Sequence, residues 1–406
     1  MPSLLRSTLT LLAGGALAQA LPLLFGPLLT RLYTPQQFGL YHLFAAVAAN
    51  VAVAACARYE FALPLVKDDA QAEALRALCG WILLVVTLLS ALGGGVWAVL
   101  GHAAWPLWLP LAVLAFGAIS LATLEAMRRQ RFRPLAAARV VQYGGASLLQ
   151  WLAGVAQLGV HGLIVAPVLS AAAAALLLRP RLGRWWRVPR QRLREVALAQ
   201  RQFPLLNTPH AFAGALQDTL ALALITALAG PAAAGFWGLG LRYLKAPATL
   251  VGSAVSQALY PRLAQGGDRA TLASRRATMQ VMAALAAMAV PLVALVTAFG
   301  PWAFERAFGP QWRSAGELAR ALAPYIGLHF IAAPLAVVTM AWQAQAWALR
   351  LALVGQVMFV AALLVGLKLG GLVAAGWCVS LAMTLYFGWY FFKLATWPVT
   401  VSEPPT

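Results

Sequence analysis

The chain has 406 residues, of which 62% are hydrophobic and 10% are charged, and its mean hydropathy is +0.77. Soluble domains contain about 45–50% apolar residues, and a soluble protein of this size cannot bury so much apolar surface, so the bilayer must be its solvent. The formal charge of +19 would suggest nucleic acid as the partner of a soluble protein. Here, however, the basic residues lie mostly in the gaps between apolar segments, which excludes a nucleic-acid-binding protein.

Twelve apolar segments with short connections fill the chain, and each is near the roughly 20 residues that a spanning helix needs. We expect spans at 8–30, 38–64, 76–100, 105–127, 135–157, 161–178, 203–229, 232–260, 276–299, 317–341, 347–367 and 371–395. No separate soluble domain fits between them. The predicted fold is therefore an all-α polytopic membrane protein with about 12 transmembrane helices.

The 30 Lys and Arg residues are distributed unevenly over the gaps between these spans. With the N-terminus in the cytoplasm, 22 of them lie on the cytoplasmic side, five lie on the opposite side, and Arg58, Arg242 and Lys245 lie within spans. Basic residues concentrate in the cytoplasmic loops of membrane proteins. Both termini are therefore predicted to be cytoplasmic.

The longest hydrophilic stretch, 179–202, contains eight Arg residues and leaves six spans on either side. We expect an N-terminal lobe at 1–178 and a C-terminal lobe at 203–406, joined by this basic cytoplasmic loop. Equal halves around such a loop are typical of transporters built from two repeats. A shared pattern supports this reading, because Pro-x-x-x-Gly-x-aromatic follows the first span at 35–41 and the seventh at 231–237.

Several motifs occur in a fixed order along the chain. They are Arg31-Leu32-Tyr33-Thr34-Pro35, Phe38-Gly39-Leu40-Tyr41, Arg58-Tyr59-Glu60, the stretch from Gly235 through Tyr243, Pro247 and Gln257 to Pro261, and Phe308-Gly309, Trp312, Ala315-Gly316 and Ala323-Pro324. Together, over about residues 20–395, they resemble Wzx-type lipopolysaccharide, O-antigen and exopolysaccharide flippases of the multidrug/oligosaccharidyl-lipid/polysaccharide (MOP) exporter superfamily.

This resemblance implies two six-helix lobes in a bacterial inner membrane, similar to those of the MATE-like transporters. It also implies a substrate, a polyprenyl-pyrophosphate-linked oligosaccharide, which would move from the cytoplasmic to the periplasmic leaflet by alternating access. Besides this substrate and membrane lipid, a polysaccharide polymerase and chain-length proteins could be partners.

Polar side chains inside spans are costly in lipid and usually face a bundle interior or a cavity. At roughly 100° per residue, three spans present one polar stripe each. The stripes comprise Gln142, Gln150 and Gln157 on 135–157; Asn207, His210, Gln217 and Asp218 on 203–229; and Arg242, Lys245, Thr249, Ser253, Ser256 and Tyr260 on 232–260. We expect them to converge on a common interior or an aqueous cavity.

The stripes suggest a substrate site. Arg242 and Lys245 would bind the pyrophosphate, because Arg offers bidentate donors to phosphate and a low-dielectric surround strengthens the attraction. An ion pair between Asp218 and one of these cations is the alternative. Sugar hydroxyls would bind to amide and phenol side chains, namely Gln142, Gln150, Asn207, Gln217 and Tyr260.

Arg58 is a further candidate for the pyrophosphate, although it could instead reach lipid headgroups at the cytoplasmic end of its span. Arg58 and Glu60 are about 160° apart on a regular helix. They could line one cavity only if that helix is distorted, and Pro64 could distort it.

Energy coupling is less evident from the sequence. No G-x-x-x-x-G-K-[ST] motif is present, so this chain does not itself use ATP. Glu60, Asp218 or His210 could bind a proton or Na⁺ during transport, with structural hydrogen bonding as the alternative. The three cysteines have no paired or metal-ligand spacing, so no disulfide, metal or other cofactor is expected.

Three other functions compete with this prediction. A multidrug exporter of the same superfamily would need a carboxylate-rich cavity, whereas only Glu60, Glu125 and Asp218 lie near membrane depth. A membrane polysaccharide polymerase, ligase or glycosyltransferase would need an acidic cluster or large external loops, and the longest external stretch is about 300–316. A flippase for lipid-linked peptidoglycan precursors is closer, but its relatives have fourteen spans. We therefore predict a transporter and not an enzyme.

Overall fold

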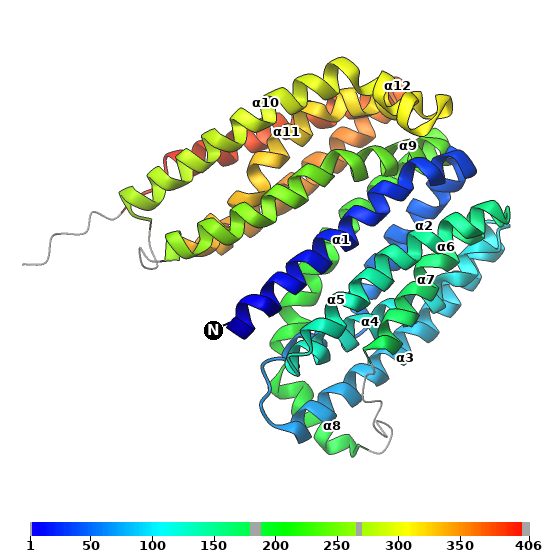
Figure 1. Cartoon of the computed structure of the whole chain (residues 1–406), viewed down its shortest axis with the longest axis vertical. Helices are drawn as coiled ribbons and strands as arrows, with labels where there is room; N and C mark the ends of the chain where they lie inside the picture. The colour runs from blue at the N-terminus through cyan, green and yellow to red at the C-terminus, as the bar shows by residue number, and fades with distance from the viewer. Residues whose placement is uncertain (1, 179–187, 265–269, 400–406) are drawn as a thin grey trace, which may run out of the picture. The chain divides into compact units, whose positions relative to one another are not determined.

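The computed structural model describes residues 2–178, 188–264 and 270–399 (Figure 1). These residues form helices and their connections, with no β-strand among them. The chain divides into two compact units, Met1–Ala223 and Leu224–Thr406, and the boundary falls inside the long helix α9. Of the predicted connection at 179–202, residues 179–187 lie outside the described residues, and 188–202 belong to the first unit.

The first unit contains α1 (Pro2–Leu32), α2 (Pro35–Ala54), η1 (Tyr59–Ala62), α3 (Asp69–Leu100), η2 (Trp105–Trp108), α4 (Leu109–Arg128), α5 (Phe132–Val140), η3 (Val141–Gly145), α6 (Ala146–Val155), α7 (Gly159–Leu177), α8 (Arg190–Ala199), η5 (Phe203–Asn207) and the beginning of α9 (Thr208–Ala264). The second unit contains the remainder of α9, α10 (Leu272–Phe308), η6 (Pro310–Trp312), α11 (Arg313–Ala341) and α12 (Gln345–Ala395).

Nine helical segments among the described residues are long and apolar enough to cross a membrane. Two of them, α9 and α12, contain a backbone break and hold two spans each. The predicted span 135–157 is distributed over α5, η3 and α6. All twelve predicted spans thus have helical counterparts, and the all-α polytopic fold is confirmed.

The break in α9 lies at Gly230, where φ is 87° and ψ is 166°, a conformation that is essentially restricted to glycine. Pro231 follows, and its fixed φ suits the first turn of a helix. α2 begins in a similar way. Pro35 occupies its first turn, and the side chains and backbones of Thr34 and Gln37 exchange hydrogen bonds in a capping box. Both copies of the Pro-x-x-x-Gly-x-aromatic pattern therefore mark the start of a helical segment.

α12 is a hairpin of two spans, and its chain reverses where Gly371 adopts φ 74°. A Cβ atom at Gly366 would lie 2.3 Å from Cα of Ala375, and one at Gly355 would lie 2.6 Å from the ring of Tyr386. The two halves are therefore antiparallel and in close contact. Small residues permit such an approach between membrane helices.

In the second unit, α11 is the central helix, because 67% of its most hydrophobic segment is buried, against 11% for α10. It packs against both α10 and α12. Pro301 inside α10 has no N–H, so the carbonyl of Thr297, four residues earlier, lacks its helical donor. Arg320 of α11 donates to that carbonyl through Nε at 2.8 Å, which joins the two helices.

In the first unit, ion pairs join the ends of α3 and α4. Buried Glu125 on α4 lies 3.3 Å from Arg76 on α3 and 2.5 Å from Arg129, which follows α4 directly. Arg128 lies 2.7 Å from Asp69, whose side chain is 91% exposed. Because Glu125 is neutralised by two arginines, it is not available as a carboxylate for a cationic cargo.

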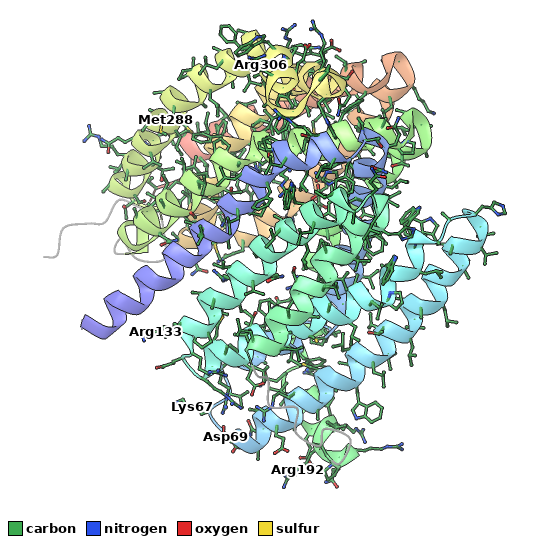
Figure 2. The ribbon with its side chains drawn as sticks, turned by 45° about the vertical axis from the view of Figure 1, so that its right-hand side comes forward. Lys67, Asp69, Arg133, Arg192, Met288 and Arg306 are labelled. Carbon is green, nitrogen blue, oxygen red and sulfur yellow. The ribbon has the colours of Figure 1, made fainter. Side chains whose placement is uncertain are left out.

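Basic residues from separate parts of the sequence gather at one end of the first unit. Figure 2 shows Lys67, Arg133 and Arg192 there, with Asp69 beside Lys67. The three basic residues come from the connection before α3, from α5 and from α8. All three belong to the set that the positive-inside rule predicts to face the cytoplasm.

Candidate functional site

The predicted span 38–64 is not one regular helix. α2 ends at Ala54, and the chain then turns with positive φ at Ala57 (47°) and Arg58 (63°) before η1 begins. The expectation of a continuous helix through Arg58 and Glu60 was therefore wrong, because the chain turns at Ala57 and Arg58 and not at Pro64. Arg58 is half-buried and Glu60 is buried.

Gln142 and Gln150 belong to different helical segments. Gln142 is half-buried on η3, a π-helical turn, and Gln150 is buried on α6. A π-helical turn holds more residues than an α-helical one. The angle between the two side chains therefore differs from the one predicted for a regular helix.

The Gln150 side chain fills a specific gap in the hydrogen bonding of α7. Pro167 lies inside α7 and has no N–H, so the carbonyl of Leu163 has no helical donor. Gln150 Nε2 donates to this carbonyl at 3.0 Å. The structure thus gives Gln150 a role in joining α6 to α7, and a proline four residues after the orphan carbonyl is the sequence signal for it.

Asn207, the last residue of η5, is exposed. On the first half of α9, Asp218 is exposed and Gln217 is half-buried. The next residue, Thr219, packs against α2. Its hydroxyl donates to the carbonyl of Ala46 at 3.1 Å, and it accepts from Nδ2 of Asn50 at 3.4 Å. Asp218 lies about 100° around the helix from this packed face. Asn50, a buried polar residue in a spanning helix, was not singled out from the sequence, although its polarity in an apolar segment was a usable signal.

On the second half of α9, Arg242 and Lys245 are half-buried and three residues apart. The described carboxylates of the second unit are Glu305 and Glu317, and both contact Arg313, at 2.8 and 3.8 Å. Within the described part of this unit, no carboxylate therefore neutralises Arg242 or Lys245.

Further along the predicted stripe, Thr249 and Ser253 are exposed, and their hydroxyls donate to carbonyls of their own helix. The Ser256 hydroxyl donates to the carbonyl of Pro334 on α11 at 3.1 Å. His210 and Tyr260, the other candidates on α9, lie outside the residues whose side chains the structure describes. The stripe therefore begins with two cations and continues into a helix–helix contact.

A small cavity of about 50 Å³ lies between α9, α10 and α11. Its lining comprises Tyr243, Leu244, Pro247, Leu292, Val293, Val296, Ala323, Ile326 and Gly327. Sites for drug-sized ligands usually measure about 300–1,000 Å³ and contain polar groups. This cavity is too small and too apolar to hold a glycan.

Comparison with known proteins bears on both family and fold. The model of the family described as polysaccharide biosynthesis protein matches residues 28–317. No curated protein matches the sequence. Among solved structures, the lipid II flippase MurJ in an inward closed conformation is similar with a TM-score of 0.71 and 8% identity, over 95% of this chain and 87% of that one.

Two further structures are similar over nearly the whole chain. An inward-facing multidrug resistance MATE family transporter of the MOP superfamily has a TM-score of 0.66 and 14% identity, over 93% of this chain and 94% of that one. A MOP superfamily transporter from Pyrococcus furiosus has a TM-score of 0.56 and 13% identity, over 96% and 95%. At such identities the likeness shows the fold. With the family match over most of its length, the chain belongs to the polysaccharide biosynthesis protein family and has the fold of MOP superfamily transporters.

Proposed function

We propose that the protein is a flippase that moves a polyprenyl-pyrophosphate-linked oligosaccharide from the cytoplasmic to the periplasmic leaflet of the bacterial inner membrane. One observation carries the proposal. Arg242 and Lys245 lie together on a spanning helix of a polysaccharide biosynthesis protein, and no carboxylate in the described part of their unit neutralises them.

The depth of these cations makes an anionic cargo the natural counter-charge. Arg242 is 12 residues beyond the break at Gly230, roughly 18 Å along the helix. A charged side chain at membrane depth is expensive unless it pairs or faces water. A pyrophosphate would bind both cations through short charge-assisted hydrogen bonds, whereas a cationic drug would be repelled.

The remaining parts of the substrate have simpler requirements. Asn207, Gln217 and Gln142 could hydrogen-bond sugar hydroxyls, and the polyprenyl tail could stay in lipid. Gln150 is left out of this proposal, because its amide already donates to α7. We propose Asp218 and His210 as sites for a coupling proton or Na⁺. Glu60, the third such candidate, is buried beside Cys56 and Cys79.

The orientation is part of the same proposal. Reporter fusions after residues 190 and 400 should register in the cytoplasm, and a fusion near 232 should register outside, because 22 basic residues lie on one side of the predicted spans and five on the other. A fusion after residue 190 that registers outside would contradict this orientation.

The test of the site is the double variant Arg242→Ala/Lys245→Ala in a strain that lacks other flippases. We expect it to insert and accumulate normally but to lose glycan export. A matched control is Arg350→Ala/Lys368→Ala, which removes one Arg and one Lys from exposed positions on α12 and should retain export. Normal export by the first variant would eliminate the cationic site.

A binding measurement separates the two substrate classes. Ligands that bind only the folded state raise its apparent stability. Polyprenyl-pyrophosphate glycans should therefore raise the melting temperature of the purified wild-type protein and not that of the Arg242→Ala/Lys245→Ala variant. Cationic dyes such as ethidium should give no comparable shift. Stabilisation by the dyes alone would favour a multidrug exporter.

A further inference from the structure

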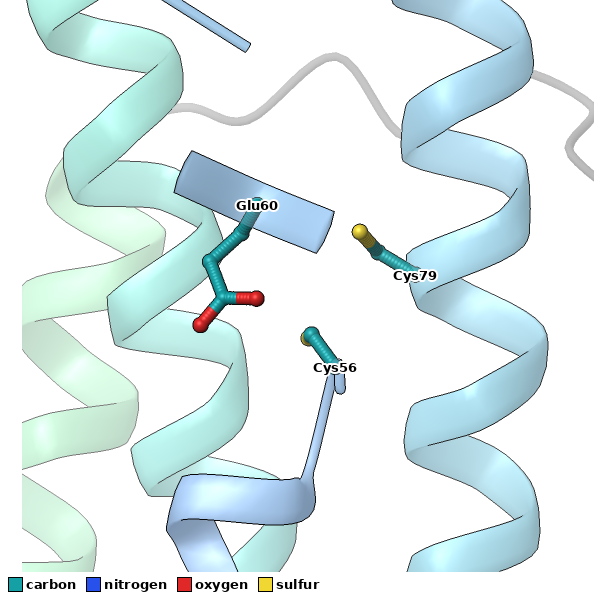
Figure 3. A group of neighbouring side chains, drawn as sticks. All are labelled: Cys56, Glu60 and Cys79. Carbon is teal, nitrogen blue, oxygen red and sulfur yellow. The ribbon is translucent and has the colours of Figure 1, made fainter. Parts of the chain in front are cut away.

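Three buried side chains with metal-binding atoms meet in the first unit. Cys56 lies in the turn after α2, Glu60 lies on η1, and Cys79 lies on α3. Their two sulfurs and one carboxylate oxygen all lie within 4.8 Å of one another, and Figure 3 shows the three side chains pointing toward a common centre. They are 1%, 3% and 0% exposed. The sequence spacing of the two cysteines gave no sign of this arrangement.

The Glu60 carboxylate is incompletely satisfied in this position. Its Oε1 accepts a hydrogen bond from the Ser120 hydroxyl at 3.4 Å. Its Oε2 is buried and has no hydrogen-bond partner among the described residues. A buried oxygen without a partner is unusual in folded proteins and commonly marks a missing ion or water. This orphaned oxygen is independent of the sulfur geometry and points to a ligand at the same place.

The donor set fits a soft divalent cation. Zinc binds thiolate sulfur at about 2.3 Å and carboxylate oxygen at about 2.0–2.2 Å in tetrahedral sites. Donors around such an ion are separated by roughly 3.4–3.8 Å, so donors that already lie within 4.8 Å would move little to close on it. Three protein donors leave one position for water.

Arg58 balances the charge of such a site. Two thiolates and a carboxylate around a divalent ion leave a net charge of −1. Arg58 lies two residues from Glu60 and is half-buried, with its guanidinium carbon 4.9 Å from the centre of the Phe61 ring. Its Nε has no hydrogen-bond partner among the described residues. The charge of this guanidinium, two residues from Glu60, would offset the net charge of a loaded site.

We propose that Cys56, Cys79 and Glu60 form a binding site for a zinc ion that fixes the turn between α2 and η1 to α3. The turn contains two positive-φ residues, Ala57 and Arg58, which are unfavourable for side chains larger than glycine. A metal bridge from both sides of these residues to α3 would hold them in place. This site is separate from the proposed flippase activity and does not depend on it.

The test uses the full-length purified protein, kept reduced, with Co²⁺ as a spectroscopic substitute for Zn²⁺. We expect about one Zn²⁺ or Co²⁺ per chain, a thiolate-to-cobalt charge-transfer band in the near ultraviolet, and displacement of that band by Zn²⁺. Cys79→Ser should abolish the band and the bound metal. Cys378→Ser, which changes the remaining cysteine and lies in the second unit, should leave both unchanged.

A second measurement follows the thermal stability of the protein. Added Zn²⁺ should raise the melting temperature of the metal-free wild-type protein, and Glu60→Gln should weaken this effect while the protein keeps its elution volume. The proposal is overturned if the wild-type protein binds no metal, or if Cys79→Ser binds as well as wild type. It is also overturned if, in protein purified without reductant and then denatured, Cys56 and Cys79 resist alkylation until a reductant is added, since that result identifies a disulfide. None of these readouts involves transport.

Discussion

Substitution of Gln150 distinguishes a structural role for this residue from a role in substrate binding. Its amide donates to the Leu163 carbonyl, which Pro167 leaves without a helical donor. Gln150→Leu keeps a side chain of similar size and removes the donor. An unsatisfied buried carbonyl costs about 1–3 kcal/mol, and lipid supplies no replacement donor. We expect the free energy of unfolding to fall by about that amount.

The proline makes the prediction specific. Pro167→Ala restores a backbone N–H that can reach the same carbonyl, so Gln150→Leu/Pro167→Ala should recover most of the lost stability. The assay is equilibrium unfolding of purified protein in mixed micelles, with export measured per folded molecule in cells. We expect Gln150→Leu to retain export once its abundance is corrected. The reasoning fails if Pro167→Ala gives no rescue, and a loss of export by well-folded Gln150→Leu would return this residue to the substrate site.

Two further predictions concern stability. Glu125→Ala should lower the free energy of unfolding by about 2–4 kcal/mol, somewhat below the cost of breaking a fully buried ion pair, because the side chains of Arg76 and Arg129 are 16% and 23% exposed. Asp69→Ala, which removes an exposed ion pair, should give no resolvable change in the same unfolding titration. Equal effects of the two substitutions would contradict this prediction. Gly230→Ala should lower the free energy of unfolding by about 1–3 kcal/mol, because the backbone conformation of Gly230 is essentially restricted to glycine. Gly214→Ala, where a Cβ atom meets nothing within 4 Å, should leave stability unchanged or slightly increased. A Gly230→Ala variant as stable as wild type in thermal unfolding would refute the prediction.

The number and order of the spans could be predicted because the bilayer imposes them. Its thickness sets the length of each apolar segment, and every segment must be helical to satisfy its own backbone. The start of α2 was also visible, since Thr34, Pro35 and Gln37 are the residues of a capped helix. These features depend on local sequence alone.

The arrangement of polar side chains could be predicted only in part. The predicted faces assumed regular helices, and this assumption failed at the turn around Ala57 and Arg58 and at η3. Contacts between distant residues were not accessible either. Cys56 meets Cys79 and Glu125 meets Arg76 because segments distant in the sequence pack side by side, and the spacing of residues along one chain does not encode such neighbours.

The hairpin of α12 bears on how the chain enters the bilayer. Its 51 residues are more than twice the roughly 20 of a single span, and the only interruption is a glycine turn with no hydrophilic stretch. No hydrophilic segment therefore separates the first half from the second, so the first half is not expected to insert into the membrane as a single span before the second half is synthesised. We expect the insertion machinery to release both halves as a pair, with the close glycine contacts already formed.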